Sequence, residues 1–515
     1  VDLLWNGGIG TYFKASHQSH IDAGDPTNNT VRVNADELRA RAVGEGGNLG
    51  FTQAARIEYA LKGGRINTDF IDNSGGVDMS DHEVNLKILL NPLVKSGRLT
   101  WDERNVLLEA LTTQVADDVL ANNERHGLQL SLDSVRSHRD PMLYSRTIDW
   151  ITQRGGQNRA RLGLPSDDDL RRRSKSGTGL TRPELAVIQA HVKMHVFKDL
   201  ELSDNSVVPG FEDIVLRYFP PRIREEFADD VRAHMLYNSI GMTMVLNSIV
   251  GDAGAHFLPL VNELTGRPFV EIARAWHFAM QLVNADALRP TLAKAGSSFE
   301  TRYRAWDRVT RAVQAVVSIW LGPGEPGPDA ENLDTIRQVL ERFRTIEGTS
   351  HHSRLDGRVD LLMGRDLPAD VAGRLALLDE LPAAREIARI CTDGDIDSAM
   401  VRYLAVGEAS KLLPAIRALQ ERKASGGWDP VAVSILRTRY VRLLRELVAA
   451  VDLTRETPLG VDRAATLLGR GRLKSLRDLV DHILGEQPGI PAILVAEERI
   501  RAWIADYSAQ AVAAR

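Results

Sequence analysis

Apolar residues near the start of the chain occur in three short runs, each followed closely by glycine. The runs cover residues 1–5, 40–44 and 67–71, and residues 52–61 between the last two have a helical pattern. Short apolar runs joined by crossovers are typical of parallel strands. The pattern therefore predicts an α/β segment in which three strands end at glycine-rich turns.

From about residue 84 the apolar spacing changes to that of α-helices, beginning with residues 84–90 and 101–123. Another helix is predicted at Thr181, because Thr181 and Glu184 form a capping box and Pro183 suits a first turn. Later amphipathic stretches cover residues 231–250, 269–283, 302–321, 334–343, 430–451 and 491–505. The fold class predicted is α/β followed by mainly α, with a possible subdomain break in the Gly/Pro-rich stretch near 322–331.

Composition narrows the class of protein. The chain has 515 residues, a length for which two to four domains are expected. Its residues are 43% hydrophobic and 26% charged, which is typical of globular proteins, and its net charge is −5. This charge gives no overall attraction to nucleic acid or to an anionic membrane. No apolar run is long enough for a membrane span, and the single cysteine, Cys391, fits a reducing, cytoplasmic location. The chain begins in mid-pattern without methionine, which we interpret as a C-terminal portion of a longer polypeptide.

The first glycine-rich turn, residues 7–10, does not fit the dinucleotide-binding pattern G-x-G-x-x-G. Taken alone, it is most simply a tight turn. Three such turns at the ends of three successive strands favour a ligand site over simple tight turns, because ligands of open α/β sheets lie at the carboxyl ends of the strands.

The third turn carries the most specific pattern. Asn73, Ser74 and two glycines precede Ser80 and Glu83, which read as a capping box for a helix that begins near Asp81. Ser80 either only caps this helix, or its hydroxyl binds a carboxylate at the positive helix N-terminus. The local pattern leaves both interpretations open.

Two of these turns resemble a known family. Residues 45–48 (Glu-Gly-Gly-Asn) and 73–77 (Asn-Ser-Gly-Gly-Val) are similar to the E-G-A-N and N-A-G-G-V signatures of glutamate dehydrogenases. The strings at 1–11, 63–69, 80–85 and 180–187 resemble the large bacterial NAD-dependent type more specifically. The resemblance implies that residues 1–95 are the C-terminal part of a Rossmann-like NAD-binding catalytic domain. Residues 96–515 would then form an α-helical C-terminal domain.

The resemblance also implies roles for individual residues. Cofactor-binding positions would be Asn6, Gly7, Gly8, Asn48 and Asn73, with NAD as the cofactor. Val77 would wall the pocket for L-glutamate or 2-oxoglutarate, and Ser80 would bind the side-chain carboxylate.

The family's catalytic lysine, catalytic aspartate and pyrophosphate loop are expected upstream of Val1. No catalytic residue is therefore assigned in this chain, and the chain alone is expected to be inactive. The full-length enzyme is expected to be a homo-oligomer.

Alternatives remain at this point. The long helical region could be a non-catalytic assembly or regulatory module of a larger dehydrogenase, because little chemistry is evident after residue 90. Related dehydrogenases act on branched or aromatic amino acids, but they have an apolar residue where Ser80 stands.

His191 and His195 have a metal-binding spacing without the acidic residue of a metalloprotease, so no metal is expected. Residues 171–173, three arginines beside three aspartates, are expected to form a solvated loop and no nucleic-acid site.

Overall fold

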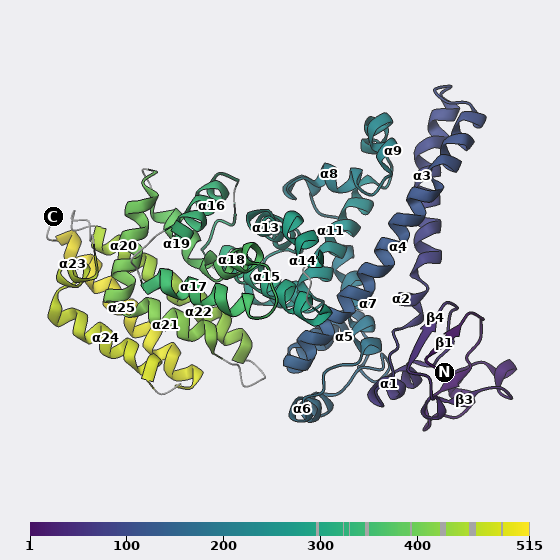
Figure 1. Ribbon diagram of the computed structural model, residues 1–515, viewed down its shortest axis with the longest axis horizontal. Helices are drawn as coiled ribbons and strands as arrows, with labels where there is room; N and C mark the ends of the chain where they lie inside the picture. Colours follow the sequence, from purple (N-terminus) through teal and green to yellow (C-terminus); the bar gives the residue numbers. More distant parts are fainter. Residues whose placement is uncertain are drawn as a thin grey trace. The chain divides into compact units, whose positions relative to one another are not determined.

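The computed structural model describes residues 1–294, 298–322, 324–328, 330–345, 350–391, 394–422, 429–452, 460–485 and 488–513. Their contacts divide the chain into two compact units, Val1–Arg274 and Ala275–Arg515. Helices dominate both units (Figure 1). The domain boundary predicted at residue 95 coincides with a helix end inside the first unit and stays a prediction. The break predicted near 322–331 also stays a prediction, and Pro323 and Asp329 lie outside the described residues.

Two small parallel sheets make up the α/β segment. Strand β1 (Leu3–Asn6) pairs with β4 (Ala42–Glu45), and β2 (Phe13–Lys14) pairs with β3 (Val33–Asn34). The first two predicted strands are thus confirmed. Helix α1 (Gln53–Leu61) follows as predicted, because the Thr52 hydroxyl accepts a hydrogen bond from the Ala55 amide and caps it. A core of Phe13, Val43, Phe51, Tyr59 and Ile66 holds this segment together.

The third predicted strand is wrong. Residues 69–72 form the short helix α2 (Asp69–Asp72), and only Arg65, just before the predicted run, bridges to β4 at Ala42. A short apolar run cannot be assigned to strand or helix by periodicity alone. Here Asp72 accepts a hydrogen bond from the amide of Glu45, at the end of β4, and Asp69 accepts one from the amide of Leu49, beyond it. These side-chain contacts take the place of strand pairing.

The predicted helix start near Asp81 is also wrong. Helix α3 (Ser74–Lys95) begins six residues before Ser80. The Ser80 hydroxyl donates to the Val77 carbonyl oxygen inside this helix, and Glu83 pairs with Lys87 one turn further on. Both side chains of the apparent capping box are therefore used within the helix, so the box does not mark its beginning.

The remaining helices of the first unit include the two predicted at residues 101–123 and from Thr181, the first of which continues to Arg139, and several that the sequence pattern did not predict. They are α4 (Trp101–Arg139), α5 (Met142–Gly155), α6 (Asp167–Ser176), α7 (Arg182–Glu201), α8 (Phe211–Leu216), α9 (Pro221–Glu226), α10 (Ala228–Arg232), α11 (Tyr237–Ala253) and α12 (Phe257–Thr265). The predicted stretch 231–250 is broken between α10 and α11. The solvated loop predicted around 171–173 is instead helix α6, because Ser166 and Asp169 form a capping box at its start.

A buried carboxylate joins three of these helices. Asp133 of α4 accepts hydrogen bonds from Tyr144 of α5 at 2.9 Å and from Gln189 of α7 at 2.8 Å. Arg136 also donates to Asp133 at 3.0 Å. A buried charge is tolerated only when it is paired and hydrogen-bonded. Asp133 therefore fixes how α4, α5 and α7 pack in the interior of this unit.

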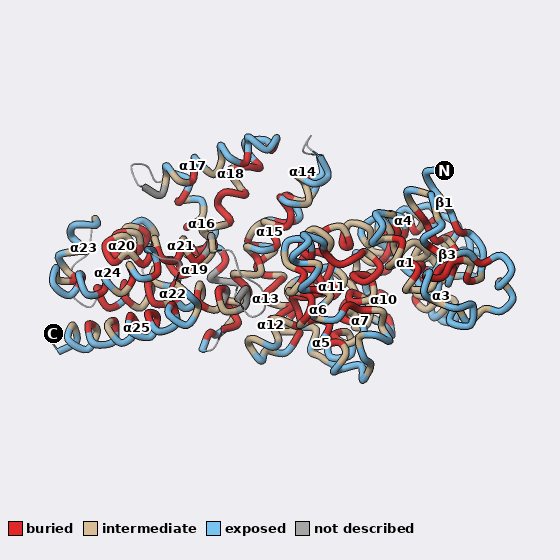
Figure 2. Tube along the Cα trace, turned by 90° about the horizontal axis from the view of Figure 1, so that it is seen from below, coloured by how far each residue is buried: buried red, intermediate tan, exposed pale blue. Residues whose placement is uncertain are grey.

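The division between the two units falls within helix α13 (Phe269–Leu282). All the regular elements in the described residues of the second unit are helices. They are α14 (Ala285–Lys294), α15 (Phe299–Trp320), α16 (Ala330–Thr345), α17 (Ser350–Met363), α18 (Ala369–Leu377), α19 (Leu381–Ile390), α20 (Ile396–Ala409), α21 (Leu412–Glu421), α22 (Asp429–Asp452), α23 (Val461–Leu467), α24 (Arg470–Gly485) and α25 (Ile490–Ala513), with short 3-10 turns besides. Buried and exposed positions alternate with helical spacing along α25 (Figure 2). The predicted amphipathic stretches of this region are confirmed as helices.

The described residues contain no single helix that is long and apolar enough to cross a membrane. The bent pair α11 and α12 meets the length and composition criteria together, and most of its residues are buried in the first unit.

The start of α7 gives a test of helix capping. Thr181 is buried, and its hydroxyl donates to the Glu184 carboxylate at 2.8 Å and accepts from the Glu184 amide at 3.4 Å. We expect Thr181→Ala to lower the free energy of unfolding by about 1 kcal/mol, measured by urea denaturation. The control is Thr178→Ala, which removes an exposed hydroxyl three residues earlier. Equal losses in the two variants would contradict the capping role.

Candidate functional site

Two glycine-rich turns meet where β1 and β4 end. The Gly47 amide donates to the Asn6 carbonyl oxygen at 3.0 Å. A Cβ atom added to Gly47 would lie 2.6 Å from the Gly8 carbonyl oxygen, closer than side chains approach. Glycine is therefore required at position 47 for the two turns to touch.

The third glycine-rich turn reaches the same edge of the sheet. Asn73, just before α3, donates from its side-chain amide to Asn48 Oδ1 at 2.8 Å. The turns after residues 6, 45 and 72 are thus brought together, although the third follows a helix and no strand.

Asn6 differs from its neighbours because it is buried. Gly7, Gly8 and Asn48 are exposed, whereas Asn6 is 9% exposed. Its side-chain nitrogen is enclosed and has no hydrogen-bond partner among the described residues. Gly50 lies so close to this nitrogen that no side chain would fit there. Buried polar groups without a partner are rare, and a bound water or ion is one way in which such a donor is satisfied.

Three candidate residues form a stripe along α3. Asn73, Val77 and Ser80 are spaced at i, i+4 and i+7, which places them on one face of a helix. The side chain of Val77 is 63% exposed, and Ser80 is exposed as well. Because α3 starts at Ser74, the stripe is continuous and rises about 10 Å along the helix. A helix beginning at Asp81 would not have aligned these residues.

The glycine turn after β4 is held by two carboxylates of α2. Asp72 Oδ2 accepts from the Glu45 amide at 3.0 Å, and Asp69 Oδ2 accepts from the Leu49 amide at 2.8 Å. Leu49 has a positive φ of 63°, which is unfavourable for a residue with a side chain. The two hydrogen bonds therefore fix both ends of the turn that carries Asn48.

An arginine of α1 lies beneath the same turn. Arg56 donates to both oxygens of the buried Glu45 carboxylate, at 2.7 and 2.9 Å, and lies 3.2 Å from Asp69. Burial raises the pKa of Glu45, although Arg56 opposes this shift. Burial likewise raises the pKa of Asp72, while hydrogen bonds from Asn67 and the Glu45 amide lower it. Three carboxylates, those of Glu45, Asp69 and Asp72, lie here, and Arg56 is the arginine that pairs directly with two of them. The contacts that hold the turn therefore depend on whether these carboxylates are protonated.

Helices α4 and α7 hold the other side of α2 and α3. Asn123 donates to the Ile71 carbonyl oxygen at 3.0 Å and to Ser74 Oγ at 2.9 Å. Asn122 donates to Asp78 at 2.9 Å, so Asp78 points away from the stripe. Arg182 of α7 donates to Asn67 Oδ1 at 2.7 Å, and Asn67 in turn donates to Asp72.

These supporting residues were not predicted from the sequence. The sequence predicts a helix that ends at Asn123, so no local signal indicates that α4 continues and that the side chains of Asn122 and Asn123 bind α2 and α3.

The histidine pair, for which no metal is expected, is not among the residues of the glycine turns or of α3. His191 and His195 lie with ring centres 6.1 Å apart on α7, and burial lowers the pKa of both. In the described parts of the chain, no three His, Cys, Asp or Glu side chains are grouped as a metal site requires.

Two models of known protein families match parts of this chain. Residues 1–133 match the model of the bacterial NAD-glutamate dehydrogenase catalytic domain. Residues 177–467, more than half of the chain, match the model of the glutamate dehydrogenase C-terminal region. The chain belongs to the bacterial NAD-glutamate dehydrogenase family.

Three relatives named NAD-specific glutamate dehydrogenase are similar over much of the chain. The protein of Mycobacterium tuberculosis is 44% identical over 54% of this chain and 17% of its own length. Those of Pseudomonas aeruginosa and Halomonas elongata are 36% and 32% identical over 84% and 96% of the chain, and over 27% and 32% of their own lengths. The chain therefore spans about a third or less of the length of these family members.

The contacts of Asn123 lead to a first prediction for this site. Asn123→Ala removes two hydrogen bonds to the junction of α2 and α3, each worth about 1 kcal/mol. We expect faster amide hydrogen exchange at residues 71–76 and unchanged exchange in α1, measured by mass spectrometry. Glu124→Ala, an exposed neighbour on α4, is the control. Unchanged exchange at 71–76 would show that α4 does not hold the junction.

The raised pKa of Asp72 leads to a second prediction. The folded protein binds this proton more tightly than the unfolded chain, so stability falls as the pH rises from about 4, the ordinary carboxyl value, through the raised pKa. Asp72→Asn removes this contribution. The unfolding free energy of the variant minus that of the wild type should therefore increase over this pH range, with exposed Asp117→Asn as the control. A decrease would mean that Arg56 and Arg182 outweigh burial.

Proposed function

We propose that the longer protein containing this chain catalyses NAD-dependent oxidative deamination of L-glutamate to 2-oxoglutarate and ammonia. The observation that carries the proposal is the hydrogen bond between Asn73 and Asn48. It joins the two family signatures at one edge of the sheet, within the part of the chain that matches the family's catalytic domain. The curated relatives are named for the same cofactor and substrate.

The converging turns support a cofactor site. We infer that β1 and β4 belong to a Rossmann-like sheet, and that Asn6, Gly7, Gly8, Asn48 and Asn73 line the nicotinamide end of its cleft. Gly47 packs against Gly8, whose backbone is exposed, and the unpartnered Asn6 amide offers a donor there. These residues fit NAD. When bound, NAD accepts the hydride from the substrate; the residues of this chain orient the reacting groups.

The stripe on α3 supports a substrate site beside the cofactor. Val77 would provide an apolar wall, and Ser80 a hydroxyl for the side-chain carboxylate of glutamate. Rotating the Ser80 hydroxyl away from the Val77 carbonyl oxygen would free it for this bond. Because Asp78 is held by Asn122 on the opposite face, its charge does not repel a dicarboxylate on the stripe. Ser80 favours an acidic over an apolar amino acid, as desolvating a carboxylate requires replacement hydrogen bonds.

A second role for the helical region is compatible with the structure. The described part of the second unit contains only helices. An assembly or regulatory function for this unit stays a hypothesis, as do a homo-oligomeric state and a cytoplasmic location. We assign no catalytic residue to this chain, and expect the chain alone not to reduce NAD with glutamate.

Ser80→Val in the longer protein tests the substrate assignment. It removes one hydrogen bond to a charged group, worth about 1.5–3 kcal/mol. Steady-state kinetics should show a roughly ten- to hundredfold fall in kcat/KM for glutamate, with little change in the KM for NAD. Discrimination against norvaline, which lacks the carboxylate, should narrow by a similar factor.

The control is Ser203→Val, because Ser203 also donates its hydroxyl to a backbone carbonyl oxygen. Equal losses for glutamate and norvaline would make Ser80 a structural residue only. Absence of glutamate-dependent NAD reduction in the unmodified longer protein would refute the proposed function itself.

A further inference from the structure

The Gly/Pro-rich stretch predicted as a subdomain break contains a buried carboxylate. Glu325 lies between α15 and α16, and its side chain is 4% exposed, whereas its neighbours Gly324 and Pro326 are exposed. Its amide donates to the Gly322 carbonyl oxygen at 3.1 Å, which closes a tight turn. A carboxylate is stable in the interior only when it is paired. The packing of this stretch therefore depends on the partners of Glu325.

Four arginines from two helices reach this carboxylate. Arg385 and Arg389 of α19 donate to Glu325 Oε2, the latter at 2.5 Å. On α22, Arg442 lies 3.2 Å and Arg445 3.7 Å from Glu325 Oε1. Burial opposes ionisation of Glu325, but the arginines outweigh it and lower its pKa. We call these four arginines the arginine group.

Positive charge is in excess in this group. Glu386, which is fully buried, pairs with Arg385 and lies 3.1 Å from Arg445. In the described chain, Arg385, Arg389 and Arg445 thus share two carboxylates, those of Glu325 and Glu386. Guanidinium groups in a low-dielectric interior repel one another when counter-charges are too few. An additional anion beside the arginine group would therefore stabilise it.

A cavity adjoins the arginine group. It has a volume of about 40 Å³ and is lined by Arg385 and Arg389, and its other walls are mostly apolar and include Trp320, Leu333 and Ile336. A water molecule needs about 10–15 Å³ of such space, so the cavity has room for a monatomic ion but not for a nucleotide or a dicarboxylate.

Arg389 has donors left for a ligand of this cavity. Within the described residues, its guanidinium bonds to Glu325 through Nη1, and its Nε and Nη2 atoms make no hydrogen bond. The Arg389 side chain is 34% exposed, so an ion can reach it from solvent. Arg385 is only 4% exposed, so water screens its charge poorly.

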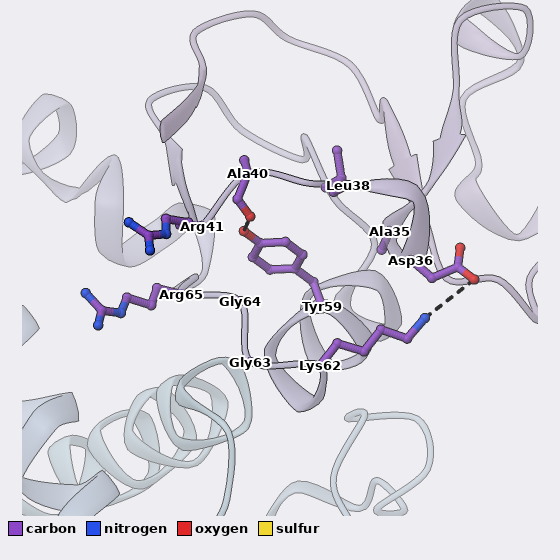
Figure 3. Close-up of a pocket in the computed structure, with 10 residues that line it drawn as sticks. All are labelled: Ala35, Asp36, Leu38, Ala40, Arg41, Tyr59, Lys62, Gly63, Gly64 and Arg65. Atoms are coloured by element: carbon purple, nitrogen blue, oxygen red, sulfur yellow. Dashed lines mark hydrogen bonds and ion pairs between the residues drawn. The ribbon is translucent and has the colours of Figure 1, made fainter. Parts of the chain in front are cut away.

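A larger pocket of the first unit does not combine these features. It has a volume of about 430 Å³ and lies beside Tyr59, and Figure 3 shows the side chains of Arg41 and Arg65 extending away from that ring. Lys62, at another wall, pairs with Asp36. The charged side chains of this pocket therefore do not converge, unlike those of the arginine group.

We propose that the cavity beside the arginine group binds one small monovalent anion, of the size of chloride, in contact with Arg389 and Arg385. The unused donors of Arg389 hold the ion, and its charge offsets part of the repulsion within the group. The apolar walls favour a weakly hydrated ion, because a strongly hydrated one loses more on leaving water. The bound ion thereby strengthens the attachment of the Gly/Pro-rich stretch to α19 and α22. The site is independent of the proposed dehydrogenase activity, because none of its residues belongs to the glycine turns or to α3.

Chlorine NMR on this chain tests the proposal, because chloride that exchanges with a protein site broadens the signal of the free ion. Sodium gluconate, whose anion is too large for the cavity, keeps the ionic strength constant during the titration. We expect saturable broadening by the wild type and an at least tenfold weaker chloride affinity in Arg389→Gln. Arg365→Gln removes an exposed arginine outside the arginine group and should bind chloride as the wild type does.

Circular dichroism checks that Arg389→Gln is folded, and a second measurement needs no variant. Crystals of the chain soaked in bromide should show an anomalous diffraction peak in the cavity, in contact with the Arg389 guanidinium. Equal chloride affinity of the wild type and Arg389→Gln would overturn the proposal, as would bromide peaks elsewhere with none in this cavity. Equal weakening in Arg365→Gln would show a general effect of charge and would also overturn it.

Discussion

The candidate site depends on one buried group of charges beneath a glycine turn. Arg56 binds the Glu45 carboxylate through two hydrogen bonds and also pairs with Asp69. Asp69 and Asp72 use their remaining oxygens to hold backbone amides at the two ends of the turn. A glycine-rich turn has high conformational freedom in the unfolded chain. Without these side-chain contacts, the chain would have little to keep Asn48 facing Asn73.

Helix α3, which follows the third turn, has two faces with different contacts. Ser74 and Asp78 point toward α4, where two neighbouring asparagines bind them. Val77 and Ser80 remain open on the other face. The polar contacts with α4 thus hold one face of α3 and leave Val77 and Ser80 exposed on the other.

Elements with local signals were predictable from the amino-acid sequence. Thr52 and Thr181 start their helices, since a cap needs only a hydroxyl and the next few amides. The strands β1 and β4 and the family signatures at 45–48 and 73–77 were also readable from the chain, because apolar runs and glycine turns leave a direct pattern.

What lies between these signals depends on contacts between residues far apart in the chain. Residues 69–72 became a helix because their carboxylates bind amides about 20–27 positions earlier in the chain. Helix α3 begins at Ser74 because Asn123, about 50 residues later, binds its first turn. No local pattern encodes such partners, since their contribution exists only once the distant segments are packed together.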